Sequence, residues 1–151
     1  NREILLRGKS ANTGEWVEGF CVQFGETYSN IIIREIGKLN LYGVVPIYEH
    51  EIVISETVGQ YTGLKDKNGR KIFEGDIVRR FNRNGQEIMS YVVEWYSDCC
   101  MFVLDCIDFD MEFDTDFTVF YGDEFEIVGN IHDNPELVRK DEENGSSYKS
   151  D

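Results

Sequence analysis

Large apolar residues recur at every second position along several segments, which is the period of a β-strand with one covered face. The segment from Glu15 to Phe24 places them at even positions, and the segment from Glu87 to Tyr96 alternates in the same way. Shorter apolar runs, rich in β-branched residues, are typical of further strands. They lie at residues 31–33, 51–54, 77–78, 101–107 and 125–131. We therefore predict a mainly β fold.

Turn signals separate these segments at short intervals. Asn68-Gly69 is the preferred pair of a two-residue type I′ hairpin, in which both residues have positive φ. Residues 39–48 contain a proline and are expected to be irregular or to form an edge strand. Near the end, Asn134 can cap a helix that begins at Pro135, so we predict one short C-terminal helix. Short strands joined by glycine-rich corners indicate a small β-barrel or a strongly bent sheet.

The chain has 151 residues and a formal net charge of −14, but its acidic excess is confined to one segment. Residues 1–83 hold 12 basic and 11 acidic side chains, whereas residues 84–138 hold 14 acidic side chains and no lysine or arginine. Such a field repels nucleic acid and anionic lipid, and it attracts cations or basic surfaces. The sequence also contains no apolar run of about 18 residues, the length that a membrane span needs. We therefore expect a cytoplasmic protein with neither nucleic acid nor membrane as its partner.

The densest acidic stretch alternates carboxylates with mostly apolar residues. In an extended strand, these carboxylates would project from one face about 7 Å apart. A calcium loop of the EF-hand type fits poorly, because Phe113 stands where that loop needs glycine. A solvated strand face, an acidic docking surface and a cation site all stay open. The five residues, here called the acidic ladder, are Asp108, Asp110, Glu112, Asp114 and Asp116.

Positive charge is concentrated from Lys65 to Arg83. These side chains are Lys65, Lys67, Arg70, Lys71, Arg79, Arg80 and Arg83. We expect the arginines to face acidic strands of the same chain or of a neighbouring copy, because the acidic half would oppose the approach of DNA.

The residues that could support catalysis are few. The four cysteines, Cys21, Cys99, Cys100 and Cys106, match neither a disulfide framework nor a C-x-x-C metal pattern, and their apolar neighbours predict buried, reduced thiols. The sequence lacks the motifs of nucleotide-binding proteins, zinc proteases and serine hydrolases. We expect no enzyme activity, no cofactor and no metal.

Three stretches together form a recognisable signature. They run from Arg2 to Gly19 (REILLRGKSANTGEWVEG), from Gln60 to Val78 (QYTGLKDKNGRKIFEGDIV) and from Gly129 to Leu137 (GNIHDNPEL). This signature resembles that of the YopX family of phage and prophage proteins. The resemblance implies an SH3-type β-barrel around the central stretch and a phage or prophage origin, and it brings no catalytic residues. We interpret the signature positions as structural, with the glycines allowing unusual backbone conformations. They are Gln60, Tyr61, Gly63, Leu64, Asp66, Asn68, Gly69, Glu74, Gly75, Asp76, Gly129, Asn130, Asn134 and Pro135.

These observations predict three regions. Residues 1–58 form an N-terminal β region, and residues 59–138 form the SH3-like barrel with the start of the C-terminal helix. Residues 139–151 form a polar, flexible tail.

The expected function is that of a non-enzymatic, phage-encoded protein of unknown molecular function that acts as a binding or assembly module. Its partner would be an unidentified protein or a second copy of the chain, and aromatic residues such as Trp95 and Tyr96 are candidates for a subunit interface. The alternative is an acidic DNA mimic that occupies a host DNA-binding protein, because carboxylates about 7 Å apart approach the spacing of phosphates.

Overall fold

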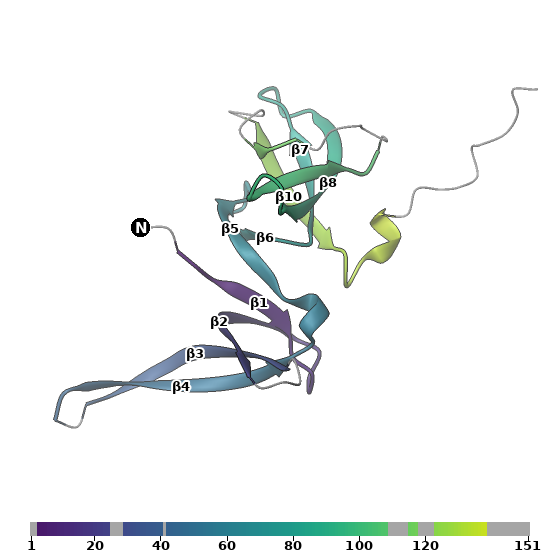
Figure 1. Cartoon of the computed structure of the whole chain (residues 1–151). Helices are drawn as coiled ribbons and strands as arrows, with labels where there is room; N and C mark the ends of the chain where they lie inside the picture. Colours follow the sequence, from purple (N-terminus) through teal and green to yellow (C-terminus); the bar gives the residue numbers. More distant parts are fainter. Residues whose placement is uncertain (1–2, 25–28, 41, 109–114, 118–122, 139–151) are drawn as a thin grey trace, which may run out of the picture. The chain divides into compact units, whose positions relative to one another are not determined.

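The computed structural model describes residues 3–24, 29–40, 42–108, 115–117 and 123–138. The chain divides into two compact units, Asn1–Gly75 and Asp76–Asp151, which we call the first and the second unit. Each unit is built around an antiparallel sheet (Figure 1), so the prediction of a mainly β fold is confirmed.

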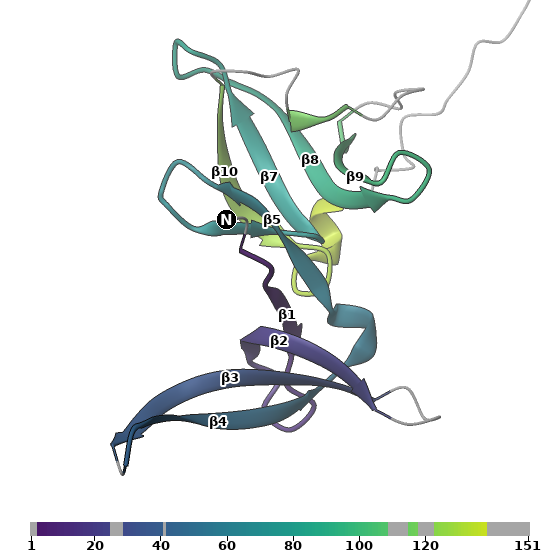
Figure 2. The same ribbon diagram turned by 60° about the vertical axis from the view of Figure 1, so that its left-hand side comes forward.

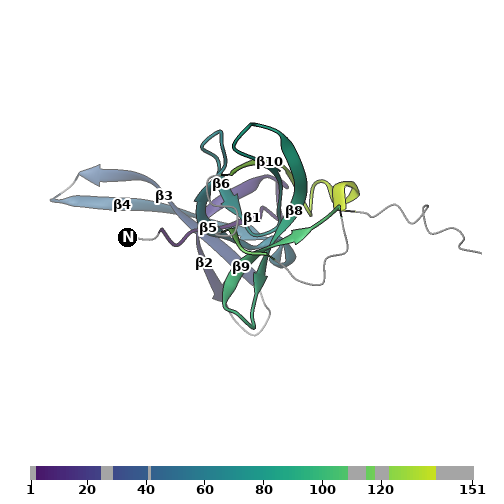
Figure 3. The ribbon, with the colours of Figure 1, turned by 90° about the horizontal axis from the view of Figure 1, so that it is seen from above.

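The first unit contains a six-stranded sheet with the strand order β4-β3-β2-β1-β5-β6. Its strands are β1 (Leu6–Lys9), β2 (Trp16–Phe24), β3 (Ser29–Asn40), β4 (Val44–Val53), β5 (Gly59–Lys65) and β6 (Lys71–Phe73), with the 3₁₀ helix η1 (Ser55–Thr57) between β4 and β5. β3 and β4 are 12 and 10 residues long. Figures 1 and 3 show that they form a hairpin whose tip lies well beyond the other strands of this sheet.

The second unit contains a four-stranded sheet with the strand order β10-β7-β8-β9, which Figure 2 shows side by side. Its strands are β7 (Asp76–Phe81), β8 (Glu87–Tyr96), β9 (Met101–Cys106) and β10 (Glu124–Asn130). A single 3₁₀ turn, η3 (Pro135–Val138), follows β10 and begins at the proline where the sequence predicts a short helix.

Each unit has its own buried apolar residues. In the first unit, Ile32, Val53, Ile72 and Phe73 are no more than 3% exposed. A Cβ atom at Gly8 would lie 3.0 Å from Cβ of Val53, so the glycine allows β1 to pack closely against the end of β4. Burial of this kind supplies about 1.5–3 kcal/mol for each large apolar side chain.

The middle of β8 forms the centre of the second unit. Tyr91, Val92 and Val93 are consecutive buried residues, so this strand is covered on both faces. Val92 lies opposite Ile77 of β7, and Val93 lies opposite Leu104 of β9. The sequence pattern predicted the strand correctly, but it assigned covered positions to only one face.

The SH3-type barrel is not confirmed. Within the described residues, neither sheet closes on itself, because β4 and β6 form the edges of the first sheet and β10 and β9 those of the second. The reason lies in a long-range pairing: β5 lies against β1, with Leu6 opposite Gln60 and Arg7 opposite Gly59. The first half of the family signature is therefore part of the six-stranded sheet.

The predicted type I′ hairpin at Asn68-Gly69 is also wrong in detail. Gly69 has a φ of +81°, but Asn68 is not among the described residues with positive φ. The Asp66 carboxylate accepts the N–H groups of Asn68 and Arg70, each at 2.9 Å, and its carbonyl accepts the N–H of Gly69 at 2.9 Å. This pattern is typical of a type I turn followed by glycine, in which aspartate at the first position holds the turn.

Candidate functional site

The central family signature shapes the β5–β6 hairpin and the corner after it. Tyr61 is buried, and its ring centroid lies 5.6 Å from that of Phe73. Gly63 has a φ of +92° at the irregularity in the β5–β6 ladder. The Glu74 carboxylate accepts the N–H of Gln60 at 3.4 Å. These residues therefore direct the backbone of the hairpin.

The rest of this signature includes both open and buried positions. Leu64 is 43% exposed, whereas Asp76 is 1% exposed at the start of β7. Gly75 has a φ of +81° directly before Asp76, a conformation that favours glycine. Asp66 is buried, and it accepts from Arg70 Nε at 2.9 Å and from Arg70 Nη2 at 2.8 Å.

The closing signature shapes the turn between β10 and η3. Asn130 Oδ1 accepts the N–H groups of His132 and Asp133 at 3.0 and 2.9 Å, and its Nδ2 donates to the Asp133 carboxylate at 2.8 Å. Asn134 Oδ1 in turn accepts the N–H of Asn130 at 3.3 Å. A Cβ atom at Gly129 would lie 2.5 Å from this oxygen, so any larger residue would displace Asn134. Pro135 follows as the first residue of η3.

Most of the acidic ladder lies outside the described residues, because its three central members fall within residues 109–114. Asp108 lies in a bend after β9, where its carboxylate accepts the N–H of Ser90 at 2.8 Å. Asp116 is half-buried beside the isolated bridge that Thr115 makes with β9. Neither of these two described members belongs to a strand.

Two arginines of β7, Arg79 and Arg80, pair with carboxylates of the same unit, in line with the expectation that they face acidic residues. Arg79 Nε lies 3.5 Å from Glu87, and Arg80 Nε lies 3.7 Å from Asp123. The Arg80 guanidinium also lies 6.0 Å from the centre of the Tyr91 ring. The Arg79 side chain stays 43% exposed, whereas the Arg80 side chain is 14% exposed.

The prediction of four buried thiols is wrong for two of them. Cys106 is buried and Cys21 is half-buried, and burial raises the pKa of the Cys21 thiol. Cys99 and Cys100, however, are exposed in the turn between β8 and β9. Their apolar neighbours misled the prediction, because residues of a hairpin turn leave the covered faces of the sheet.

Two kinds of feature are absent from the part of the chain that the structure describes. No three histidine, cysteine, aspartate or glutamate side chains there come close enough together to hold a metal ion. None of the helices there has the length and apolar character of a membrane span.

An open apolar surface lies on one face of β2, β3 and β4. Residues that are opposite each other in an antiparallel ladder share a face. Phe20 lies opposite Ile33, Ile31 opposite Ile52, and Ile33 opposite His50, with Tyr48 two residues further along β4. We call this set the hairpin face: Phe20, Ile31, Ile33, Tyr48, His50 and Ile52.

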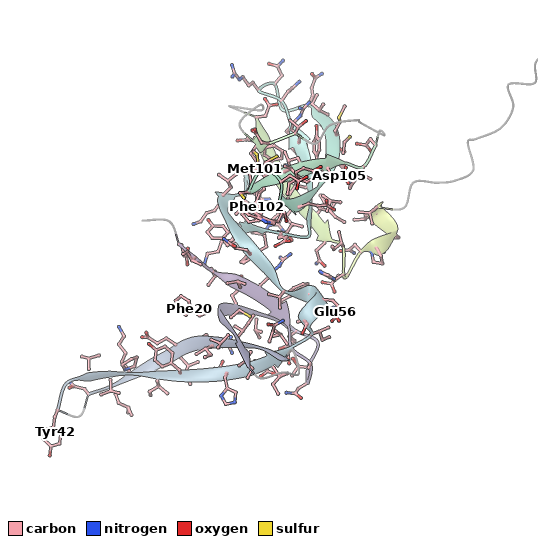
Figure 4. The ribbon with its side chains drawn as sticks, viewed as in Figure 1. Phe20, Tyr42, Glu56, Met101, Phe102 and Asp105 are labelled. Carbon is pink, nitrogen blue, oxygen red and sulfur yellow. The ribbon has the colours of Figure 1, made fainter. Side chains whose placement is uncertain are left out.

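The hairpin face is uncovered although it is largely apolar. Phe20 is 61% exposed, Tyr48 54% and Ile52 48%. With Glu49, four of its members line a shallow pocket of about 350 Å³. The opposite face of the same strands holds the buried core residues Ile32 and Val53. Figure 4 shows Phe20 projecting from β2, and Tyr42 at the tip of the hairpin.

Charged groups of the hairpin are mostly paired locally. Arg34 pairs with Glu49 across the two strands. Glu51 accepts hydrogen bonds from Ser10 Oγ at 2.5 Å and from Asn12 Nδ2 at 3.1 Å. These two bonds hold the pKa of the Glu51 carboxyl below its usual value of 4.5. The hairpin is thus electrostatically compensated while its apolar face is open.

The sequence analysis did not identify the hairpin face as a candidate site. Three consecutive isoleucines, Ile31 to Ile33, suit a strand that is covered on both faces as well as one that is covered on one face. The structure buries Ile32 and leaves Ile31 and Ile33 half-exposed. A run of this kind signals an uncovered apolar face only once the sheet is known.

Comparison with known proteins gives one family match and one described fold likeness. The family model described as YopX protein matches residues 6–139. The crystal structure of protein EF1440 from Enterococcus faecalis is similar, with a TM-score of 0.51 and 22% identity, over 92% of this chain and 100% of that chain. At this identity the likeness concerns the fold alone. No curated protein matches the chain.

Proposed function

The chain belongs to the YopX family, and from this premise we propose that it is a non-enzymatic assembly module that binds a second copy of itself through the hairpin face. The proposal keeps the phage or prophage origin and the cytoplasmic location that the resemblance and the sequence predict. The SH3-type barrel expected for residues 59–138 also stays a prediction, because its closure would need pairings beyond those of the described residues.

One observation carries the proposal: the exposed large apolar side chains are unevenly distributed. Of fifteen such side chains in the described residues, nine lie between Phe20 and Ile54, on β2 to β4 and the residues that border them. Monomeric globular proteins rarely expose contiguous apolar patches larger than a few hundred Å². Three of the nine, Phe20, Tyr48 and Ile52, belong to the hairpin face, and covering that face would remove their apolar surface from water at about 25 cal/mol per Å².

The charge distribution favours a second copy as the occupant. Residues 1–75 hold 9 basic and 10 acidic side chains, so two first units can approach without strong repulsion. Residues 76–151 hold 6 basic and 19 acidic side chains, so contact between two second units is opposed. Association through the hairpin face brings together the compensated parts of two chains.

The hairpin face is better suited to contact with a second copy than β4, the edge strand of the same sheet, is to strand pairing. β4 is an edge strand, but Pro46 within it lacks an N–H group, and the β3–β4 ladder is irregular between Glu35 and Gly37. Proline and bulges are features that keep edge strands from pairing with another chain. The side chains of the hairpin face remain available for packing.

Sedimentation velocity over a wide concentration range tests the proposal. We expect wild-type protein to form a dimer, and Tyr48→Ser with Ile52→Ser to weaken the dimer about tenfold or more, since buried aromatic anchors dominate interfaces. The comparison variant is Tyr96→Ser with Ile88→Ser, which changes the same residue types in the second unit at 42% and 39% exposure and so tests the other interface candidate, Tyr96. A monomeric wild type, or equal weakening by both double variants, would refute self-association through this face.

The second candidate function is the acidic DNA mimic, which is favoured by the concentration of 14 carboxylates without any lysine or arginine in residues 84–138. It is tested by capturing host proteins on tagged protein, with and without added DNA. A DNA-binding protein that DNA displaces would support this function. If Asp110, Glu112 and Asp114 are changed to lysine and the capture persists, the mimic is refuted.

A further inference from the structure

The turn that joins β8 to β9 presents two neighbouring thiols to solvent. Cys99 and Cys100 are both exposed, whereas Cys21 is half-buried and Cys106 is buried. A thiol-directed ligand in solution therefore reaches this pair most easily. Among the described residues, these are the two cysteines that are both adjacent in sequence and exposed.

The backbone at Cys100 is unusual. Its φ of +54° makes it the only non-glycine residue with positive φ in the described ranges; the others are Gly14, Gly43, Gly63, Gly69, Gly75 and Gly85. A residue with a Cβ atom is disfavoured in this conformation, which glycine adopts freely. An outlier of this kind motivates a search for a role of its side chain.

The turn is held by local contacts. Cys100 Sγ donates to the carbonyl oxygen of Ser97 at 3.4 Å, which ties the thiol to the start of the turn. On the flanking strands, Trp95 packs edge-on against Phe102 with ring centroids 5.0 Å apart. The turn that carries the two thiols is therefore fixed to the ends of β8 and β9 by side-chain contacts.

Geometry separates two uses of the pair. Adjacent Cα atoms are about 3.8 Å apart, whereas disulfide-linked cysteines usually have Cα atoms about 4.4–6.8 Å apart. A direct sulfur–sulfur bond between neighbours is therefore strained and easily reduced. A larger soft atom between the sulfurs avoids that bond, and soft centres prefer thiolate ligands.

We propose that Cys99 and Cys100 form a vicinal dithiol site that binds one soft, thiophilic centre of the trivalent arsenical class through both sulfurs. With phenylarsine oxide, two arsenic–sulfur bonds form while two S–H bonds and the arsenic–oxygen bond break. The two protons and the oxygen leave as one water molecule. The oxidation state of arsenic and sulfur does not change, so no oxidant or reductant takes part.

Intact-mass spectrometry of the reduced full-length chain with phenylarsine oxide tests the proposal. We expect one phenylarsenic group per chain, with the loss of one water molecule for each group bound. A small 1,2-dithiol should remove the group, whereas a monothiol at the same thiol concentration should not. Cys99→Ser and Cys100→Ser should each abolish uptake, and Cys21→Ser should retain it.

Cys100→Gly separates the chemical role from the conformational one. Glycine suits the positive φ, so this variant should keep its melting temperature or gain slightly, yet lose uptake. The proposal is overturned if the wild type takes up no arsenical, if uptake survives in Cys99→Ser or Cys100→Ser, or if it is lost in Cys21→Ser.

Discussion

The two units share a strand-based architecture but present different surfaces. The first unit has nearly balanced charge and most of the exposed large apolar side chains, whereas the second unit has 19 acidic against 6 basic residues. Of the net charge of −14, −13 therefore belongs to the second unit and −1 to the first. Substitutions in the hairpin face should therefore affect apolar self-association, and substitutions of carboxylates in the second unit should affect binding to a basic partner.

Each unit contains a hairpin turn that is held by a side-chain oxygen of its first residue. This residue is a charged aspartate in the first unit and a neutral asparagine in the second. In the first unit, the buried Asp66 carboxylate holds the turn and pairs with an arginine. In the second unit, the amide oxygen of Asn82 holds the turn in the same way: it accepts the N–H groups of Asn84 and Gln86 at 2.9 and 3.1 Å. The charged aspartate is buried and has Arg70 as its partner, whereas the neutral asparagine is half-buried.

The largest expected effects come from removing a core side chain in either unit. Phe73 and Leu104 are each 1% exposed. Phe73→Ala should lower the free energy of unfolding by about 3–5 kcal/mol, and Leu104→Ala by about 2–5 kcal/mol, because each leaves a cavity. Chemical denaturation measures the loss of unfolding free energy, and hydrogen exchange shows which strands lose amide protection.

Each of these variants should reduce amide protection mainly in its own sheet. Equal loss of protection in both sheets from either variant would mean one cooperative core, and it would break the comparison between units.

An intermediate effect is expected at the paired turns. Asp66→Ala removes a charged acceptor from two backbone N–H groups and from Arg70, and it should cost about 1.5–3 kcal/mol. Asn82→Ala removes a neutral acceptor and should cost about 0.5–1.5 kcal/mol. Asp66→Asn, the matched variant, should fall between them because it keeps the acceptor but loses the charge. Urea denaturation measures these losses. A larger loss of unfolding free energy in Asn82→Ala than in Asp66→Ala would contradict this account.

The smallest effect is a pH dependence confined to the first unit. Hydrogen bonds from Ser10 and Asn12 lower the pKa of Glu51 in the folded state. Glu51 therefore contributes stability above its ordinary pKa of 4.5, and this contribution is lost as the pH falls through the lower folded value. Compared with wild type, Glu51→Gln should show a weaker loss of stability in acid.

Asn12→Ala should change this pH dependence in the same direction, because it removes one of the two donors to Glu51. Thermal unfolding of the three proteins over an acidic pH series measures the difference. Identical pH profiles for wild type and Glu51→Gln would contradict the role given to this carboxylate.

Local chemistry made the strands and several corners predictable. The alternation from Glu87 to Tyr96 gave β8 with its observed bounds, and Pro135 marked the start of η3. The turn at Asn68-Gly69 was placed correctly but its type was not, because the Asp66 carboxylate selects a type I turn. The exposed cysteines were missed, because apolar neighbours in sequence do not show whether a residue lies in a strand or in its turn.

The sequence by itself determined that the chain is mainly β, where its acidic charge lies and which family it resembles. These properties depend on periodicity, composition and short motifs, which are local. Only the tertiary structure decided that β5 pairs with β1, that Ile31 and Ile33 face outward while Ile32 is buried, and that the hairpin face stays open. The physical reason is that alternation defines two faces of a strand, whereas long-range pairing and packing decide which face is covered.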